Sequence, residues 1–359
     1  MALHELSERE RLVLEAVIRL YVETAEPAGS RALSRRSGLG VSPATIRNTM
    51  SDLEEKGFLF HPHTSAGRVP TDKAYRLYAD AILQRPSTPN GQAYDRLAEE
   101  ISAGSTAIEA ILRRAAQSLG VLTQELGLAV GPKLDQTILR RIDLVRLSAE
   151  RVLVVLTLDG GSVRTIFLEA QGEVADGAVA DVARLLNERL AGRTLAEIRS
   201  SLSVLLRDGA DRAEVGQLLN IFVAEREQLF EAGLGDREPV VLGQASVLAE
   251  QPEFASGEKL RQLLQLTEAP GNLGELLRRR GGAGGASAAP GGQVSPGITI
   301  TIGNEHADPR FDRFTLVTGE YRAGATTGLI GVIGPTRMPY EKVIAMVSHT
   351  SRLLTELLD

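Results

Sequence analysis

Residues 29–80 read GSRALSRRSGLGVSPATIRNTMSDLEEKGFLFHPHTSAGRVPTDKAYRLYAD, and this stretch says most about the fold. Ser42-Pro43 is a strong helix start, because a serine cap followed by proline suits the first turn of a helix. The pattern predicts a helix over 43–56 that stops at Gly57. Its buried stripe consists of three apolar residues at helical spacing, Ile46, Met50 and Leu53.

Shorter patterns on both sides of this helix complete the expected N-terminal domain. A first helix follows the capping box Ser7-Glu8-Arg9-Glu10, and a second, over 31–37 with Ser30 as its cap, runs into a glycine turn at 38–40. After the long helix, 58–60 and 68–69 read as a short hairpin ended by Pro70, and Thr71 caps a helix over 72–83. The order helix, helix, turn, helix, hairpin, helix predicts a winged helix-turn-helix over residues 1–85.

The distribution of charge adds a second signal. The whole chain has a net charge of −6, which argues against a protein that coats nucleic acid generally. Residues 31–85 nevertheless carry nine Lys/Arg against five Asp/Glu, and 27–51 hold four arginines and no acid. Such a run is most often a solvated helix face, whereas its alternative is a surface that faces phosphates.

The way in which a helix-turn-helix docks on DNA identifies which residues are candidate contacts. The residues near the start of the second helix of the motif reach base edges in the major groove, where Arg pairs with guanine and Asn with adenine. The preceding helix crosses the DNA backbone, and a Gly-Arg pair in the hairpin can approach a narrow minor groove. The candidate DNA contacts are therefore Arg31, Arg35, Arg36, Ser42, Thr45, Arg47, Asn48, Thr49, His63, Ser65, Gly67 and Arg68.

The remaining chain reads as an α+β domain with an insertion. After a linker at 86–91, residues 92–119 look helical and 138–170 look like strands, with Asp159-Gly160-Gly161 as a hairpin turn. Residues 177–232 are helical and include a capping box at Thr194, strands return after 238, and a helix over 340–358 closes the chain. We interpret 92–176 and 233–359 as one domain, 177–232 as a helical insert, and the Gly-rich segment 281–297 as a mobile loop.

Motifs for catalysis are missing from the sequence. It holds no nucleophile elbow, phosphate loop, zinc-protease motif or dinucleotide fingerprint, so we expect no enzyme and no cofactor. His61 and His63 could share a metal, but they would need a third ligand and the chain has no cysteine, so we favour no metal site. The chain shows no signal peptide and no apolar run that could span a bilayer, and the lack of cysteine fits a reducing cytoplasm.

Two segments carry a family resemblance. The 29–80 stretch, with its ATIRN core at 44–48 and its HTSAGRVPT hairpin at 63–71, resembles the DNA-binding domain of the HrcA family of heat-inducible transcription repressors. The likeness extends to GLIGVIGPTRMPYEKVIAMV at 328–347, so it covers nearly the whole chain. The sequence departs from the family pattern at Pro43, where Ser is usual, and at Thr49, where an acid is usual.

The resemblance implies a multi-domain α+β protein with a winged helix, a GAF-like domain and a helical dimerisation insert within it. It further implies a homodimer that binds an inverted-repeat operator in double-stranded DNA, represses chaperone operons and is released on heat stress, with the chaperonin as modulator. The alternative that stays open is a metabolite-responsive regulator whose GAF-like domain senses a small molecule. No cluster of convergent polar residues is visible in the predicted strands of that domain.

Overall fold

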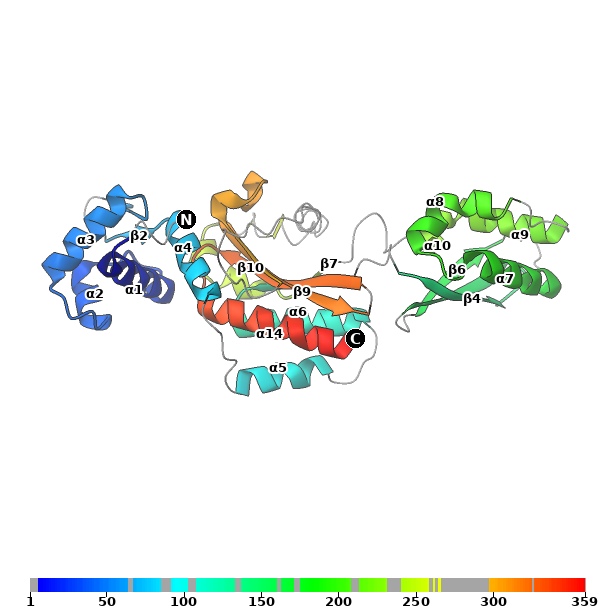
Figure 1. The fold of residues 1–359 in the computed structure, drawn as a ribbon, viewed down its shortest axis with the longest axis horizontal. Helices are drawn as coiled ribbons and strands as arrows, with labels where there is room; N and C mark the ends of the chain where they lie inside the picture. Colours follow the sequence, from blue (N-terminus) through cyan, green and yellow to red (C-terminus); the bar gives the residue numbers. More distant parts are fainter. Residues whose placement is uncertain are drawn as a thin grey trace. The chain divides into compact units, whose positions relative to one another are not determined.

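The computed structural model of the chain is mixed α and β and consists of two compact units (Figure 1). The first unit comprises Met1–Ala129, Val241–Glu320 and Leu329–Leu353, and the second comprises Val130–Val240, Tyr321–Gly328 and Leu354–Asp359. The described residues are 6–63, 67–84, 92–102, 108–132, 137–159, 163–170, 175–207, 213–230, 240–257, 261, 264–265, 297–324 and 326–358. The predicted linker at 86–91 and the Gly-rich segment 281–297, apart from Gly297, lie outside them.

The N-terminal part of the first unit follows the expected order of elements. Helix α1 (Glu8–Thr24) begins at the predicted capping box, in which the Glu10 amide donates to Ser7 Oγ over 3.3 Å and the Ser7 amide to Glu10 Oε2 over 2.8 Å. It is followed by α2 (Ser30–Arg36), α3 (Pro43–Glu55), the antiparallel strands β1 (Leu59–Phe60) and β2 (Val69–Pro70), and α4 (Asp72–Leu83).

One detail of these helices differs from the prediction. Helix α2 begins at Ser30 itself, with Gly29 as its N-cap and no side-chain capping bond. Ser30 therefore does not cap the helix as the sequence pattern indicated. In contrast, Ser42 and Thr71 each accept a backbone amide at the starts of α3 and α4, which confirms those two predicted caps.

The rest of the first unit is built on a sheet with the strand order β7-β3-β10-β9-β8 in the described residues. Its strands are β3 (Leu126–Val130), β7 (Val240–Leu242), β8 (Ile298–Ile302), β9 (Phe314–Ala323) and β10 (Thr326–Pro335). Helices α5 (Gln92–Ser102), α6 (Ile108–Thr123), α11 (Ser246–Ala249) and α14 (Tyr340–Leu358) accompany it, together with the 3-10 turns η4 (Pro252–Phe254), η5 (Gly303–Glu305) and η6 (Pro309–Phe311). Gly127 of β3 lies against the Ala116 carbonyl of α6, and Gly319 of β9 against Val347 of α14, so both helices pack on this sheet.

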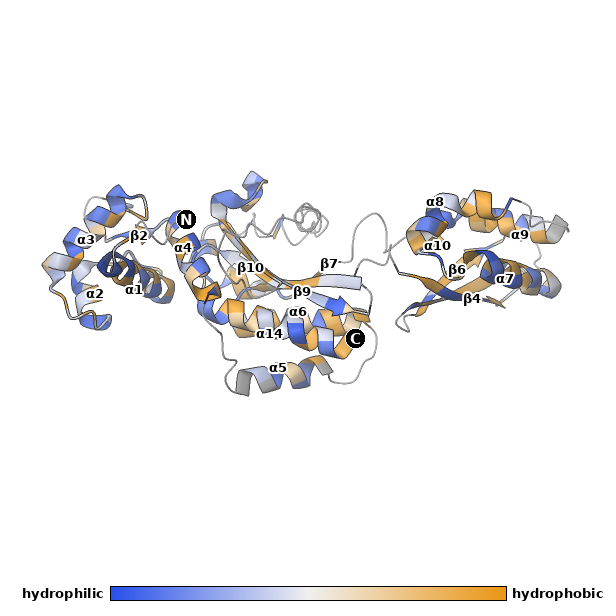
Figure 2. Cartoon of the chain, in the orientation of Figure 1, coloured by the Kyte–Doolittle hydropathy of each residue, from blue (hydrophilic) through white to orange (hydrophobic). Residues whose placement is uncertain are grey.

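The second unit joins a three-stranded antiparallel sheet to helices. Strands β4 (Leu139–Arg146), β5 (Arg151–Leu158) and β6 (Val163–Glu169) pair in that order, and the helices are α7 (Asp176–Leu190), α8 (Leu195–Leu205), α9 (Ala213–Ala224) and α10 (Arg226–Phe230). One apolar core contains Ile142 and Leu156 of the sheet together with Leu186 and Phe222 of the helices. Figure 2 shows the hydrophobic residues along these strands and helices.

This shared core moves the boundary of the predicted insert. We assigned 138–170 to the domain of the large sheet and expected a purely helical insert at 177–232. Strands β4, β5 and β6 instead pack with α7–α10, and the second unit begins at Val130. The alternation of apolar residues in a strand identifies its buried face but not the element that buries it, which explains the error.

Among the described residues, no helix is both long and apolar enough to cross a membrane.

The shared core predicts how a substitution in the sheet affects the helices. Leu156→Ala removes a fully buried side chain of β5 and should lower the free energy of unfolding of the second unit by roughly 2–5 kcal/mol. Hydrogen exchange should speed up in α7 and α9 as well as in the strands. Leu357→Ala, at an exposed leucine, is the control and should have little effect. Unchanged exchange in the helices would contradict a common core.

Candidate nucleic-acid interface

The first turn of α3 sets which of its side chains face outward. The Thr45 amide donates to Ser42 Oγ over 3.1 Å, which fixes the start of the helix. Ile46, Met50 and Leu53 are buried as predicted, whereas Arg47 and Asn48 are exposed.

The turn before α3 relies on glycine conformation. Gly38 and Gly40 have φ of 62° and 67°, in the left-handed region that favours glycine, and no atom would obstruct a Cβ at either position. Ser34 Oγ of α2 donates to the Val41 carbonyl over 3.3 Å across this turn. The two helices are thereby held in a fixed relation through a tight connection.

Four exposed arginines lie on the two helices that the glycine turn connects. Arg31, Arg35 and Arg36 of α2 and Arg47 of α3 are all exposed. In the described part of the chain none of these guanidinium groups forms an ion pair or a side-chain hydrogen bond. A guanidinium group that is not paired with a carboxylate can bind an anion. DNA phosphates are the anions that arginines on the face of a helix typically bind.

Thr49 does not share this exposed face. It is only 5% exposed, and its hydroxyl donates to the Thr45 carbonyl one turn back over 3.1 Å. Thr49 is a candidate DNA contact in the sequence, but it lies on the buried side of α3, because a residue three positions after Ile46 falls on the same side of the helix. Thr45, which is half-buried, and Ser42, which is exposed, lie at the N-terminal end of the helix as expected.

The hairpin is held against the loop before α2. Ala28 and Arg68 form a reciprocal backbone pair, with the Ala28 amide donating to Arg68 O over 2.8 Å and the Arg68 amide to Ala28 O over 2.9 Å. A Cβ at Gly67 would overlap the carbonyl groups of Pro27 and Ala28. The backbone of Gly67 thus packs closely against Pro27 and Ala28 of the same chain. We had expected this glycine to allow a close approach to DNA.

Glu54, which the sequence analysis did not single out, organises the side chains of the hairpin. Its carboxylate accepts Arg68 Nη2 and His61 Nδ1, each over 2.7 Å. The Arg68 side chain is only 13% exposed, so its guanidinium is committed to the last turns of α3. His63 is exposed, and Ser65 lies outside the described residues.

Electrostatics also fix the far end of α3. Lys56, the C-cap of α3, donates to Glu10 Oε1 of α1 over 2.7 Å. This hydrogen bond, with the capping bonds from Ser7, lowers the pKa of the Glu10 carboxyl below its ordinary value. Within the described residues, no group of three or more His, Cys, Asp or Glu side chains is arranged to hold a metal ion.

A mixed α and β protein that presents exposed arginines without ion-pair partners on two consecutive helices of its described residues is a candidate DNA-binding protein. Comparison with known proteins gives the particular family. The sequence model for the HrcA protein C terminal domain matches residues 109–344. The chain belongs to the HrcA family, whose members include heat-inducible transcription repressors.

Individual relatives span the full chain. The heat-inducible transcription repressor HrcA of Chlorobium phaeobacteroides (strain BS1) is 39% identical over 366 residues, covering 100% of both chains. The protein of the same name from Geobacter sulfurreducens is 37% identical and covers 99% of both. A crystal structure described as that of a hypothetical protein is 22% identical, covers 98% of both chains and has a TM-score of 0.65, which supports the same fold.

The close approach at Gly67 gives a test of the hairpin. Gly67→Ala should destabilise the N-terminal part by roughly 1–3 kcal/mol, because the added methyl meets backbone atoms that cannot turn away. Chemical denaturation followed by circular dichroism measures the change. Gly29→Ala, where a Cβ meets nothing within 4 Å, is the control and should cost less than about 1 kcal/mol. Equal stability of the two variants would contradict the packing described.

Proposed function

We propose that this chain represses heat-shock (chaperone) operons as a homodimer that binds an inverted-repeat operator and is released on heat stress. The observation that carries the DNA-binding part of this proposal is the set of exposed arginines without acidic partners on α2 and α3, in the part of the chain that the structure describes. Membership of a family of heat-inducible transcription repressors supports the regulatory part. DNA as the partner also favours a cytoplasmic location.

The proposed DNA-binding domain is a winged helix-turn-helix made of α1 to α4 and the β1–β2 hairpin. In this proposal α3 enters the major groove, where Arg47 and Asn48 contact base edges. Ser42 and Thr45, at the positive end of the helix dipole, lie close to phosphate. The three arginines of α2 contact the backbone beside the groove and add affinity without adding sequence preference.

The hairpin takes two kinds of role in the proposal. His63 and Ser65, near its tip, remain proposed contacts to phosphate or to the minor groove. Gly67 and Arg68 are assigned to support instead, since their backbone and side chain are engaged with Ala28 and Glu54. Thr49 is likewise assigned to packing inside the domain.

The large sheet of the first unit is proposed to be the GAF-like domain of the repressor. We further propose that a chaperonin keeps the repressor competent. On heating, unfolded clients occupy the chaperonin and the repressor loses activity. This part of the proposal rests on the family resemblance alone.

The surface that supports a homodimer is the outer face of the sheet in the second unit. One face of β4–β6 packs on the helices, while the other carries the cross-strand row Val145, Leu153 and Phe167. Val145 is 47% exposed and Phe167 54% exposed, and together with Leu153 they form a row of neighbouring apolar residues on one face of the sheet. A second copy suits this face, because a two-fold axis brings an apolar patch against itself. The family resemblance implies dimerisation through the helices of 177–232, whereas the exposed row favours the sheet.

The first prediction concerns base reading. Arg47→Ala should weaken operator binding by about 1–3 kcal/mol and relax discrimination against scrambled DNA. Arg35→Ala should weaken binding to both DNAs by a similar factor, because a phosphate contact is indifferent to sequence. Fluorescence anisotropy titrations measure both, with Arg184→Ala on α7 as a control for the loss of one exposed arginine. If Arg47→Ala bound both DNAs like the wild type, α3 would not be the recognition helix.

The second prediction concerns the dimer. Val145→Glu places a charge in the exposed row and should weaken self-association about tenfold or more, as expected for a residue at the centre of an interface. Val204→Glu makes the same change at a valine of α8 that is 63% exposed, and it should leave association intact. Sedimentation equilibrium over a range of concentrations distinguishes them. Dissociation by Val204→Glu alone would assign the interface to the helical side.

A further inference from the structure

Helix α4 is tied directly to the end of the proposed recognition helix. Its N-cap residue Thr71 donates from its amide to Phe58 O over 3.0 Å and from its hydroxyl to Gly57 O over 2.9 Å. Gly57 and Phe58 follow α3 after its C-cap residue Lys56. A shift of α4 therefore changes the position of the C-terminal end of α3.

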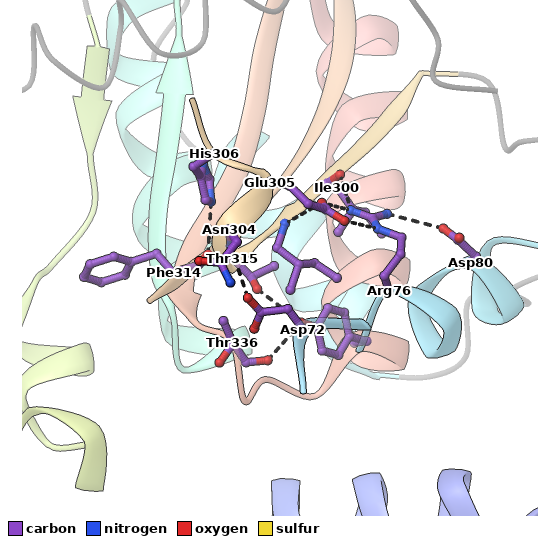
Figure 3. Close-up of polar contacts among 12 residues, drawn as sticks. Asp72, Arg76, Asp80, Ile300, Asn304, Glu305, His306, Phe314, Thr315 and Thr336 are labelled. Atoms are coloured by element: carbon purple, nitrogen blue, oxygen red, sulfur yellow. Dashed lines mark hydrogen bonds and ion pairs between the residues drawn. The ribbon is translucent and has the colours of Figure 1, made fainter. Parts of the chain in front are cut away.

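The next residue, Asp72, holds α4 to the turn η5 of the large-sheet domain (Figure 3). The Asn304 amide donates to Asp72 Oδ2 over 3.1 Å. Gly303 has φ of 49°, and a Cβ at this position would overlap the Asp72 carboxylate. The carboxylate thus lies directly on the backbone of the turn, and only glycine leaves room for it.

Arg76, one turn further along α4, holds the same turn from its other end (Figure 3). Its Nε donates to Glu305 Oε1 over 2.7 Å, Nη2 also reaches Glu305 Oε2, and Nη2 donates to the Ile300 carbonyl over 2.8 Å. Glu305 in turn accepts the Ile302 amide over 2.9 Å. A single guanidinium therefore bridges Ile300 of β8 and the 3-10 turn that follows this strand.

The boundary between α4 and the large-sheet domain contains both packed aromatic rings and an open space. The ring centroids of Tyr75 and Tyr78 lie 5.7 Å and 6.3 Å from that of Tyr340, and the Tyr78 hydroxyl donates to Glu341 Oε1 over 3.2 Å. A cavity of about 580 Å³ lies beside Asp72, between Phe60 and Pro70 of the hairpin and Phe254 and Phe314 of the large-sheet domain. Next to this cavity, Asp72 and Arg76 provide the contacts that join α4 to η5. Outside the pair Asp72 and Arg76, the described side-chain contacts across this boundary include Arg337 to the Val22 carbonyl at 2.6 Å and the exposed pair Arg19–Glu341 at 3.0 Å.

We infer that Asp72 and Arg76, with η5, form a joint through which DNA binding at α3 and the conformation of residues 298–306 affect each other. The path runs from α3 through Thr71 to Asp72, and from Asp72 and Arg76 to the end of β8. Coupling of this kind is reciprocal: a ligand that orders one end must favour the ordered state of the other. The inference rests on the proposed function, because DNA is the ligand at the α3 end.

Hydrogen exchange of the full chain with and without an operator fragment tests the joint. In the wild type, operator DNA should slow exchange in α3 and, by about fivefold or more, in the peptide that covers 298–306. Arg76→Gln, which cannot make the ionic contact, should keep protection of α3 but lose the effect on 298–306. Gly303→Ala tests the same joint from the other side, and Asp72→Asn is a milder variant that keeps a carbonyl acceptor.

Asp80→Asn is the matched control. Asp80 contacts Arg76 Nη1 over 3.3 Å within α4, one turn away from the contact with η5. This variant should behave like the wild type.

The possible outcomes separate the joint from the proposed function. If operator DNA fails to slow exchange in wild-type α3, the proposed DNA site is wrong. If α3 is protected while 298–306 is unchanged in the wild type, DNA binding stands and the joint is overturned. Coupling that persists in both Arg76→Gln and Gly303→Ala would also overturn it.

Discussion

The apolar stripe of α3 is the constraint on which the proposed function depends. Burial of Ile46, Met50 and Leu53 fixes the rotation of the helix, and the Ser42 cap fixes where it begins. Together they leave Arg47 and Asn48 exposed in the first two turns, where a groove-reading helix needs them. The free arginines of α2 add charge next to this face because the glycine turn at 38–40 holds the two helices together.

Local signals in the sequence were sufficient for most of the N-terminal elements. The caps at Ser7, Ser42, Thr71 and Thr194 are all present, since a capping bond joins residues only three positions apart. The final helix runs from Tyr340 to Leu358, over the residues that its apolar spacing indicated.

Contacts between distant residues could not be predicted in the same way. Arg76 and Glu305 are 229 positions apart, and no local pattern joins them. No sequence pattern distinguishes Glu54 from other acidic residues near the end of a helix. Its contacts with Arg68 and His61 form only when the hairpin folds against α3. The strands of 138–170 were placed with the wrong sheet for a related reason, because their alternation is the same whichever helices cover them.

The hairpin and α4 both support the C-terminal end of α3. Arg68 and Glu54 attach the hairpin to α3, and Thr71 attaches α4 to the residues that follow α3. Helix α3 is thus supported at its C-terminal end by two elements that also contact other parts of the first unit. A repressor needs such contacts if a conformational change in its other domains is to alter its affinity for DNA.

The central claim is that this chain reads a specific DNA sequence through α3 and holds it through phosphate contacts. The most direct test is a gel-shift titration of the full chain with DNA from upstream of chaperone genes that contains an inverted repeat, against a scrambled fragment, at two salt concentrations. The account predicts tight binding to the first fragment, much weaker binding to the second, and a loss of affinity for both as salt rises. Equal affinity for the two fragments would contradict it.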